Sequence, residues 1–195
     1  MAANALDGTA VAKIFTAKGR PMDNPLIVHI SHFEQIYELV REVPESAKKL
    51  ADRFWPGPLT IILPESAQIP DEVSAGLDTV AGRFPDHPVA RAVIDAAGVP
   101  LAAPSANLSG HPSPTTAAHV MNDMDGRIEA VLDGGPCSVG VESTVLTLAE
   151  QPPRLLRPGG ITLEQLKSVL GRVEMDDAVL HPLQMEACRI AGDEI

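Results

Sequence analysis

Lys18-Gly19-Arg20-Pro21-Met22-Asp23-Asn24-Pro25, followed directly by Leu26-Ile27-Val28-His29-Ile30, is the stretch that decides how this chain folds. Two cations flank a glycine that ends a helix, a turn bracketed by prolines follows, and a short apolar run then forms a buried strand. Lys18 and Arg20 are therefore expected on a loop between two packed elements, within reach of a small anionic ligand. We interpret this loop as a site for nucleotide phosphates. The alternative, a cation pair that only complements the helix dipole, stays open on the pair alone.

The length and composition favour one globular domain. The chain has 195 residues, of which 45% are apolar and 21% charged, an ordinary globular composition that argues against disorder. The formal charge of −11 counts against nucleic acid as the main partner, although it permits a local basic cleft. We expect a cytoplasmic protein, without a membrane span, in which Cys137 and Cys188 are reduced thiols.

The pattern along the chain predicts a mixed α/β fold in which strands and helices do not strictly alternate. We therefore expect a mixed sheet with helical cover instead of a doubly wound one. The predicted domain spans 1–172, and 173–195, which carry −5 of the net charge, are expected to form an acidic tail or the start of a linker. The expected helices are 7–18, about 31–41, 44–54, 88–97, about 116–122 and 162–171. The expected strands are 26–30, 59–63, 79–83, 99–103, 130–132, 145–148 and 154–157.

Polar groups elsewhere are candidates for the same site. Ser105-Ala106-Asn107 leaves an apolar strand, with Ser109-Gly110 and Ser113 beyond, where α/β folds place ligand groups, although such residues also dominate ordinary turns. Arg83 is either a cation that needs an anion or a charge at a strand end. His29 alone reads as a core histidine more than a catalyst. The histidines and cysteines lack metal-ligand spacing, which disfavours a structural zinc site.

Taken together, four segments resemble the YrdC-like family, the threonylcarbamoyl-AMP synthases, from about residue 2 to residue 171. They are Lys18-x-Arg20 with Asp23-Asn24-Pro25-Leu26-Ile27-Val28-His29, Ser105-x-Asn107 with Ser109-Gly110, Glu142-Ser143-Thr144-Val145, and Leu156-Arg157-Pro158-Gly159.

This resemblance implies a twisted α/β sheet with a concave ligand-binding face. It implies condensation of L-threonine, bicarbonate and ATP into threonylcarbamoyl-adenylate and pyrophosphate, with Mg²⁺ on the phosphates. The product would pass to a tRNA threonylcarbamoyl transferase assembly that modifies adenosine 37 of tRNA. By position, the ATP ligands would be Arg20, Asn24, Thr79, Ser105, Ser113 and Arg157. The threonine pocket would contain His29, Arg83, Ala103 and Ser143, and the catalytic signature would be Lys18, Arg20, Ser105 and Asn107.

The resemblance also exposes one departure. Relatives carry a strand and turn of the form P-T-E-T-x-Y-G-L before the segment that matches Ala2-Ala3-Asn4-Ala5, and the printed sequence starts after it. We expect reduced threonine affinity and poor stability for the chain as printed. The alternatives are an RNA-binding module of the same fold with weak RNA contact, carbamoyl-adenylate chemistry as in hydrogenase-maturation carbamoyltransferases, and an inactive truncated paralogue.

Overall fold

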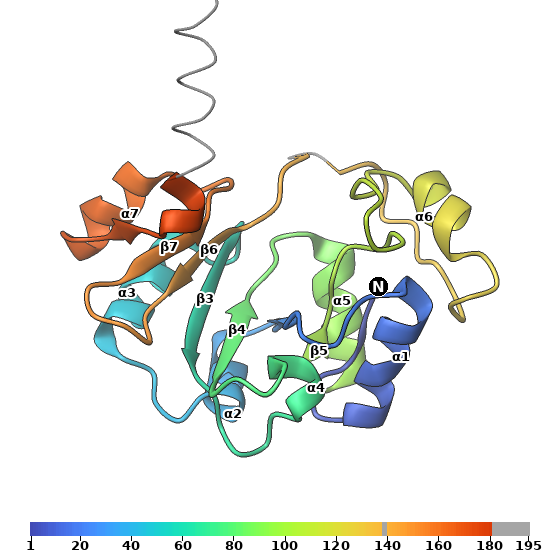
Figure 1. Cartoon of the computed structure of the whole chain (residues 1–195), viewed down its shortest axis with the longest axis horizontal. Coiled ribbons are helices and arrows are strands. Elements are labelled where there is room, and N and C mark those ends of the chain that lie inside the picture. The colour runs from blue at the N-terminus through green and yellow to red at the C-terminus, as the bar shows by residue number, and fades with distance from the viewer. Residues whose placement is uncertain (138–139, 181–195) are drawn as a thin grey trace, which may run out of the picture.

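The computed structural model describes residues 1–137 and 140–180, and its centre is one twisted mixed sheet (Figure 1). The strand order is β1-β5-β2-β4-β3-β6-β7-β8. The pairs β2/β4, β3/β6 and β7/β8 are parallel and the others are antiparallel, which confirms the predicted mixed sheet. The strands are β1 (Ala3–Asn4), β2 (Ile27–His29), β3 (Leu59–Pro64), β4 (Thr79–Arg83), β5 (Leu101–Ala102), β6 (Thr144–Thr147), β7 (Arg154–Arg157) and β8 (Glu174–Met175).

Helices flank the sheet, and most of them begin and end where the sequence predicts. Asp7 caps α1 by accepting from the backbone N–H groups of Thr9 and Ala10, and Gly19 ends this helix in the left-handed conformation. Thr162 and Gln165 form a reciprocal capping box at α7. The helices are α1 (Gly8–Lys18), α2 (Ile36–Leu39), α3 (Glu45–Phe54), α4 (Asp71–Ser74), α5 (Pro88–Ala97), α6 (Ala117–Met124) and α7 (Leu163–Leu170), with a 3₁₀ turn η1 (Phe33–Gln35).

Alternation along the central strands separates a core face from a half-exposed face. Val28, Ile61, Val80 and Leu146 are fully or almost fully buried, and the Ile36 side chain lies against Gly82 on the same face. Because side chains alternate in a strand, the neighbours of these residues point to the other face, where β4 exposes part of every second residue from 79 to 83. The candidate ligand groups on β2 and β4 are on this second face.

Two predicted elements are wrong. The residues 130–132 form no strand, and Leu132 is 69% exposed, because no described strand lies beside them. The capping box at Ser31 is also absent, since the chain enters η1 and the side chain of Gln35, not of Glu34, accepts from the Ser31 N–H group. The helix predicted to reach about residue 41 consequently ends at Leu39.

The sheet continues past the boundary placed at residue 172. Val173 is buried, and β8 pairs with β7 through Arg154 and Glu174. Residues 181–195 lie outside the described part, so the acidic tail or linker stays a prediction there. Among the residues that the structure describes, no helix has the length and apolar character that a membrane span needs.

Gly159 is a position where the fold depends on a missing side chain. A Cβ atom there would lie 2.5 Å from both the Glu142 carbonyl oxygen and the Thr144 nitrogen. Gly159→Ala should therefore lower the free energy of unfolding by about 1–3 kcal/mol, measured by urea denaturation. Gly82→Ala is the matched control, because its Cβ would meet only the flexible end of Ile36, 3.1 Å away. Equal stability of the Gly159 variant and the parent chain would contradict the close backbone approach.

Candidate functional site

One row of residues across the sheet brings four polar side chains from separate segments to the same face. In this row His29 pairs with Arg83, Arg83 with Thr60, Thr60 with Val145, and Val145 with Arg157. Residues paired in register point to the same face of a sheet, and neighbouring strands are about 4.8 Å apart. The pairing therefore places His29, Arg83, Thr60 and Arg157 along one line of the half-exposed face.

Arg157 and Ser143 form a rigid polar unit at one end of this row. The Arg157 guanidinium donates to the Ser143 carbonyl oxygen at 2.9 and 3.0 Å and to Ser143 Oγ at 3.0 Å. Ser143 Oγ also shares a 2.8 Å hydrogen bond with Thr60 Oγ1, and both hydroxyl residues are buried. A register shift between Val145 and Leu146 bulges β7 where Arg157 turns toward this unit.

Lys18 forms a second polar unit, which ties α1 to the segment after β5. Its ammonium donates to the carbonyl oxygens of Ser105 and Asn107 and to Asn107 Oδ1, at 2.5, 2.6 and 3.3 Å. The Ser109 N–H group in turn donates to the Lys18 carbonyl oxygen. Lys18 is only 2% exposed, and three oxygens take the three donors that an ammonium has. The predicted approach of Lys18 to Ser105 and Asn107 is thus present, with Lys18 anchoring the loop.

The remaining predicted residues occupy several positions around these units. Arg20 donates to the carbonyl oxygens of Asn24 and Pro25, which closes the turn between α1 and β2. The Ala103 N–H group donates to the Ile27 carbonyl oxygen beside β2. Ser113 donates to a carboxylate oxygen of Glu142. Thr79 begins β4, on the same face as Arg83 but about 13 Å along the strand. The ligand role of each of these residues stays a prediction.

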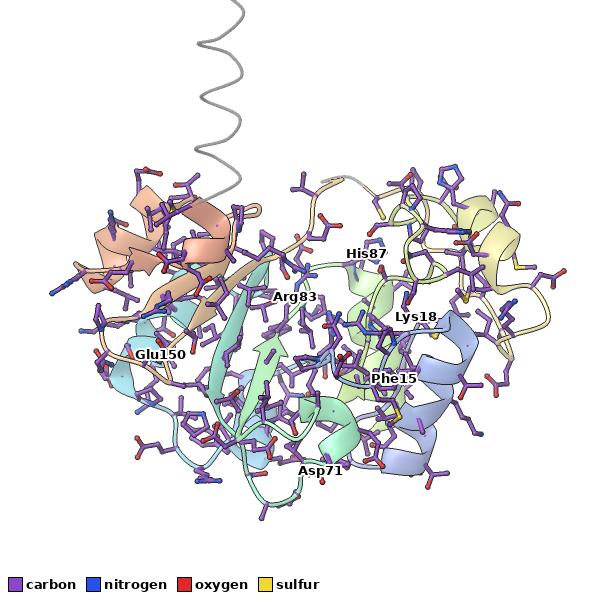
Figure 2. The ribbon with its side chains drawn as sticks, in the orientation of Figure 1. Phe15, Lys18, Asp71, Arg83, His87 and Glu150 are labelled. Atoms are coloured by element: carbon purple, nitrogen blue, oxygen red, sulfur yellow. The ribbon has the colours of Figure 1, made fainter. Side chains whose placement is uncertain are left out.

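The cations of the site are partly buried and act on one another, and both effects appear in their pKa values. Burial, and then the charge of Arg20, lower the pKa of Lys18 to about 8. Burial also lowers the pKa of Arg83 and of Arg157, and Arg157 adds to the effect on Arg83. Among the described residues, Lys18, Arg83 and Arg157 form no ion pair. The ion pairs that do form join other side chains, such as Arg154 with Glu150 and Arg172 with Glu174. Figure 2 shows Arg83 and Lys18 toward the middle of the molecule and Glu150 far to one side.

His29 is neutral in this setting. Loss of hydration, and then the nearby Arg83, lower its pKa to about 3. Its Nδ1 lies 3.2 Å from the Ile27 carbonyl oxygen, so this nitrogen carries the proton and Nε2 keeps a lone pair. The residue thus offers a hydrogen-bond acceptor beside the Arg83 cation.

Sequence reasoning missed two residues that hold the site together. Thr60 lies in an apolar strand, and its link to Ser143 spans 83 positions. Asp123 on α6 accepts from the Leu108 N–H group and from His111, which fixes the loop that carries Asn107. The N–H bond from Leu108 and the bond from His111 hold the pKa of Asp123 below its usual range. Neither role has a local signal in the sequence, because both depend on tertiary pairing.

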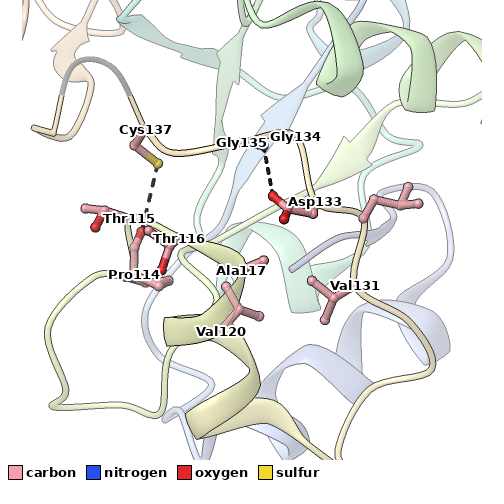
Figure 3. A pocket seen from close by; sticks show the side chains of 11 residues that line it. Pro114, Thr115, Thr116, Ala117, Val120, Val131, Asp133, Gly134, Gly135 and Cys137 are labelled. Carbon is pink, nitrogen blue, oxygen red and sulfur yellow. Dashed lines mark hydrogen bonds between the residues drawn. The ribbon is translucent and has the colours of Figure 1, made fainter.

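A cavity of about 150 Å³ lies beside α6 (Figure 3). Its walls include Thr115, Val120, Val131 and Cys137. Cys137 is an exposed free thiol, and Cys188 lies outside the described residues, so the reduced state of the two cysteines stays a prediction. No group of three or more histidine, cysteine or acidic side chains in the described part could hold a metal ion.

The fold is a mixed α/β domain whose half-exposed face carries Arg83 and Arg157 beside the hydroxyls of Thr60 and Ser143, and this set of groups could bind an anionic ligand. The family model for Sua5, YciO and YrdC proteins, described as telomere recombination, matches residues 1–159, and the chain belongs to this family.

Proteins named threonylcarbamoyl-AMP synthase are similar to this chain. One from Pyrococcus abyssi is 55% identical over 92% of this chain and 53% of its own length, and one from Bacillus subtilis is 57% identical over 90% and 51%. The crystal structure of P. abyssi Sua5 complexed with L-threonine matches with a TM-score of 0.90 at 55% identity, over 92% of this chain and 53% of that one. The chain thus spans about half the length of the curated relatives it matches.

Lys18→Met tests the loop anchor. Two buried carbonyl oxygens would lose their donor, so the free energy of unfolding at pH 7 should fall by about 1–3 kcal/mol. From pH 8 to the ordinary lysine value of 10.5, the unfolded parent chain binds more protons than the folded one, so parent stability rises with pH relative to the variant. Urea denaturation between pH 7 and 10 measures both effects. Lys13→Met, exposed on the same helix, is the control and should show neither.

Proposed function

We propose that this chain forms threonylcarbamoyl-adenylate and pyrophosphate from L-threonine, bicarbonate and ATP. The observation that carries the proposal is the row from His29 through Arg83 and Thr60 to Arg157, which presents fixed cations and hydroxyls on one face. Membership of the family and the shared name of the two relatives support it. The product would supply an assembly that transfers threonylcarbamoyl groups to adenosine 37 of tRNA, and we expect the reaction in the cytoplasm.

The proposed chemistry needs positive charge more than a nucleophile. The amine of threonine and bicarbonate form a carbamate with loss of water. A carbamate oxygen then attacks the α-phosphorus, and the bond from this phosphorus to the bridging oxygen breaks as pyrophosphate leaves. Negative charge grows on the phosphate oxygens during this step, and cations held by other bonds stabilise it without having to reorganise. Arg157 is held by Ser143, and Arg83 is held through Nε by the Gly57 carbonyl oxygen at 3.2 Å. The orientation of both guanidinium groups is therefore fixed before the ligand binds.

The neutral His29 suits the predicted threonine pocket. Its Nε2 lone pair can accept a hydrogen bond from the hydroxyl or amine of threonine, whereas a charged imidazolium would repel an ammonium group. Ser143 and Thr60 lie next along the same face, with Arg83 between His29 and Thr60. A cation flanked by hydroxyl and imidazole acceptors fits a small zwitterion that carries a carboxylate.

A Mg²⁺ ion would enter with ATP. Mg²⁺ prefers oxygen ligands, binds through one or two carboxylates together with substrate phosphates, and lowers the charge of the phosphates. Ser113 and Glu142, which contact each other, offer a hydroxyl and a carboxylate for this purpose. This pair would fit a metal ion that is shared with the nucleotide phosphates.

Purified chain incubated with ATP, bicarbonate and a panel of amino acids should release pyrophosphate selectively with threonine. Arg20→Ala should lower the rate about 100-fold, since it removes a cation at the predicted phosphate site. Arg53→Ala, exposed on α3, is the control and should keep the parental rate. Pyrophosphate release without threonine selectivity, or RNA binding that ignores ATP with no release, would overturn the proposal.

Thr60→Val tests the threonine end of the row. The substitution keeps the shape but removes the hydroxyl that holds Ser143 Oγ, so KM for threonine should rise about 3- to 10-fold while kcat and KM for ATP change little. Initial rates at varied threonine and at varied ATP separate these parameters. Thr147→Val, a buried threonine of β6 that bonds only Ala149, is the matched control. A rise in KM for ATP, with KM for threonine unchanged, would contradict the assignment of Thr60 to the threonine pocket.

A further inference from the structure

The Glu142 carboxylate contacts the side chain of Ser113, a residue that is predicted to bind ATP. Ser113 Oγ donates to Glu142 Oε1 at 3.1 Å and so joins the segment before α6 to the segment before β6, across 29 positions of sequence. Both side chains are exposed, and an incoming phosphate can therefore reach them. The resemblance assigns a role to Ser113 but none to Glu142.

Glu142 also lies beside Arg157. The Arg157 guanidinium donates to the carbonyl oxygen and Oγ of Ser143, the residue that follows Glu142. The negative charge of Glu142 opposes the lowering of the Arg157 pKa by burial. The backbone holds this arrangement, because Gly159, two residues after Arg157, packs directly on the Glu142 carbonyl group. One carboxylate thus faces two groups that are predicted to bind ATP.

The carboxylates near the other cations are arranged differently. Asp123 is occupied by the Leu108 N–H group and His111, and it raises the pKa of Lys18 only from a distance. Asp23 acts on Arg20 and Asp86 on Arg83 in the same indirect way. Among these acids, Glu142 is the one that is hydrogen-bonded to a predicted ATP-binding side chain, so a triphosphate that binds Ser113 would have to displace it.

We propose that Glu142 makes the site select metal-complexed nucleotide over free nucleotide. This inference rests on the proposed function. A free triphosphate would be repelled by the Glu142 carboxylate and would compete with it for Ser113 and Arg157. A bound Mg²⁺ removes much of the repulsion and takes carboxylate oxygens as ligands. Glu142 is therefore a specificity residue: its charge weakens binding of the metal-free form and spares or favours the metal-bound form.

The test compares Glu142→Gln with the parent chain by isothermal titration calorimetry. The amide keeps an acceptor for Ser113 but loses the charge. We expect Kd for ATP and for inorganic tripolyphosphate in excess chelator to fall about 3- to 10-fold, with Kd for ATP in excess Mg²⁺ unchanged or raised. The gain should shrink in high salt, since both side chains are exposed. Glu150→Gln, an exposed carboxylate paired with Arg154, is the matched control and should change neither value.

A second variant separates charge from tethering. Ser113→Ala removes the hydrogen bond but keeps the carboxylate, so it should weaken both nucleotide forms and preserve the ratio of their affinities. An unchanged ratio in Glu142→Gln, or equal weakening of both forms, would overturn the inference while leaving the proposed function standing. If the parent chain failed to bind ATP in any form, the result would contradict the proposed function and this inference together.

Discussion

The register of the central strands is the constraint on which the site depends. Arg83 lies between His29 on one side and Thr60 on the other, and the same row continues to Arg157. A slip of one residue in β4 would move Arg83 to the core face and Gly82 to the ligand face. Gly82 helps to prevent that slip, because the Ile36 side chain lies against it and leaves no room for an arginine. Core packing on one face thus selects the residues presented on the other.

Two anchors then convert this row into a site with defined edges. At one edge, Lys18 fixes the backbone of Ser105 and Asn107, and Asp123 fixes the next residues of the same loop. At the other edge, Arg157 fixes Ser143, and the close approach of Gly159 fixes the backbone around it. In both cases a cation is satisfied by backbone oxygens and not by a carboxylate. Its charge therefore remains available to a ligand while its position is set by the fold.

The parts of the fold that the sequence predicts are those with local signals. Asp7 and Gly19 bracket α1, and Pro88 and Gly98 bracket α5, so those helices have the expected limits. Local signals fail where a segment needs a partner: residues 130–132 have strand-like residues, but no strand in the described part of the chain pairs with them. In the candidate site, the contact of Lys18 with Ser105 and Asn107 was predicted through the family pattern. The contacts of Thr60 and Asp123 were not, because each joins segments with unremarkable local sequence.

The acidic net charge and an anion site are compatible because charge acts locally. At physiological salt, interactions between exposed charges fade beyond about 8 Å, so most of the 26 acidic residues do not affect a ligand in the site. The acids that matter are those whose charge acts on a cation of the site: Asp23 on Arg20, Asp123 on Lys18, Asp86 on Arg83 and Glu142 on Arg157. Each of these carboxylates opposes the effect of burial on the pKa of its cation. If the proposed reaction takes place in this site, unopposed cations would bind the triphosphate and the pyrophosphate product with similar strength, and release would be slow. Carboxylates that act on the cations would limit that affinity and would so favour turnover.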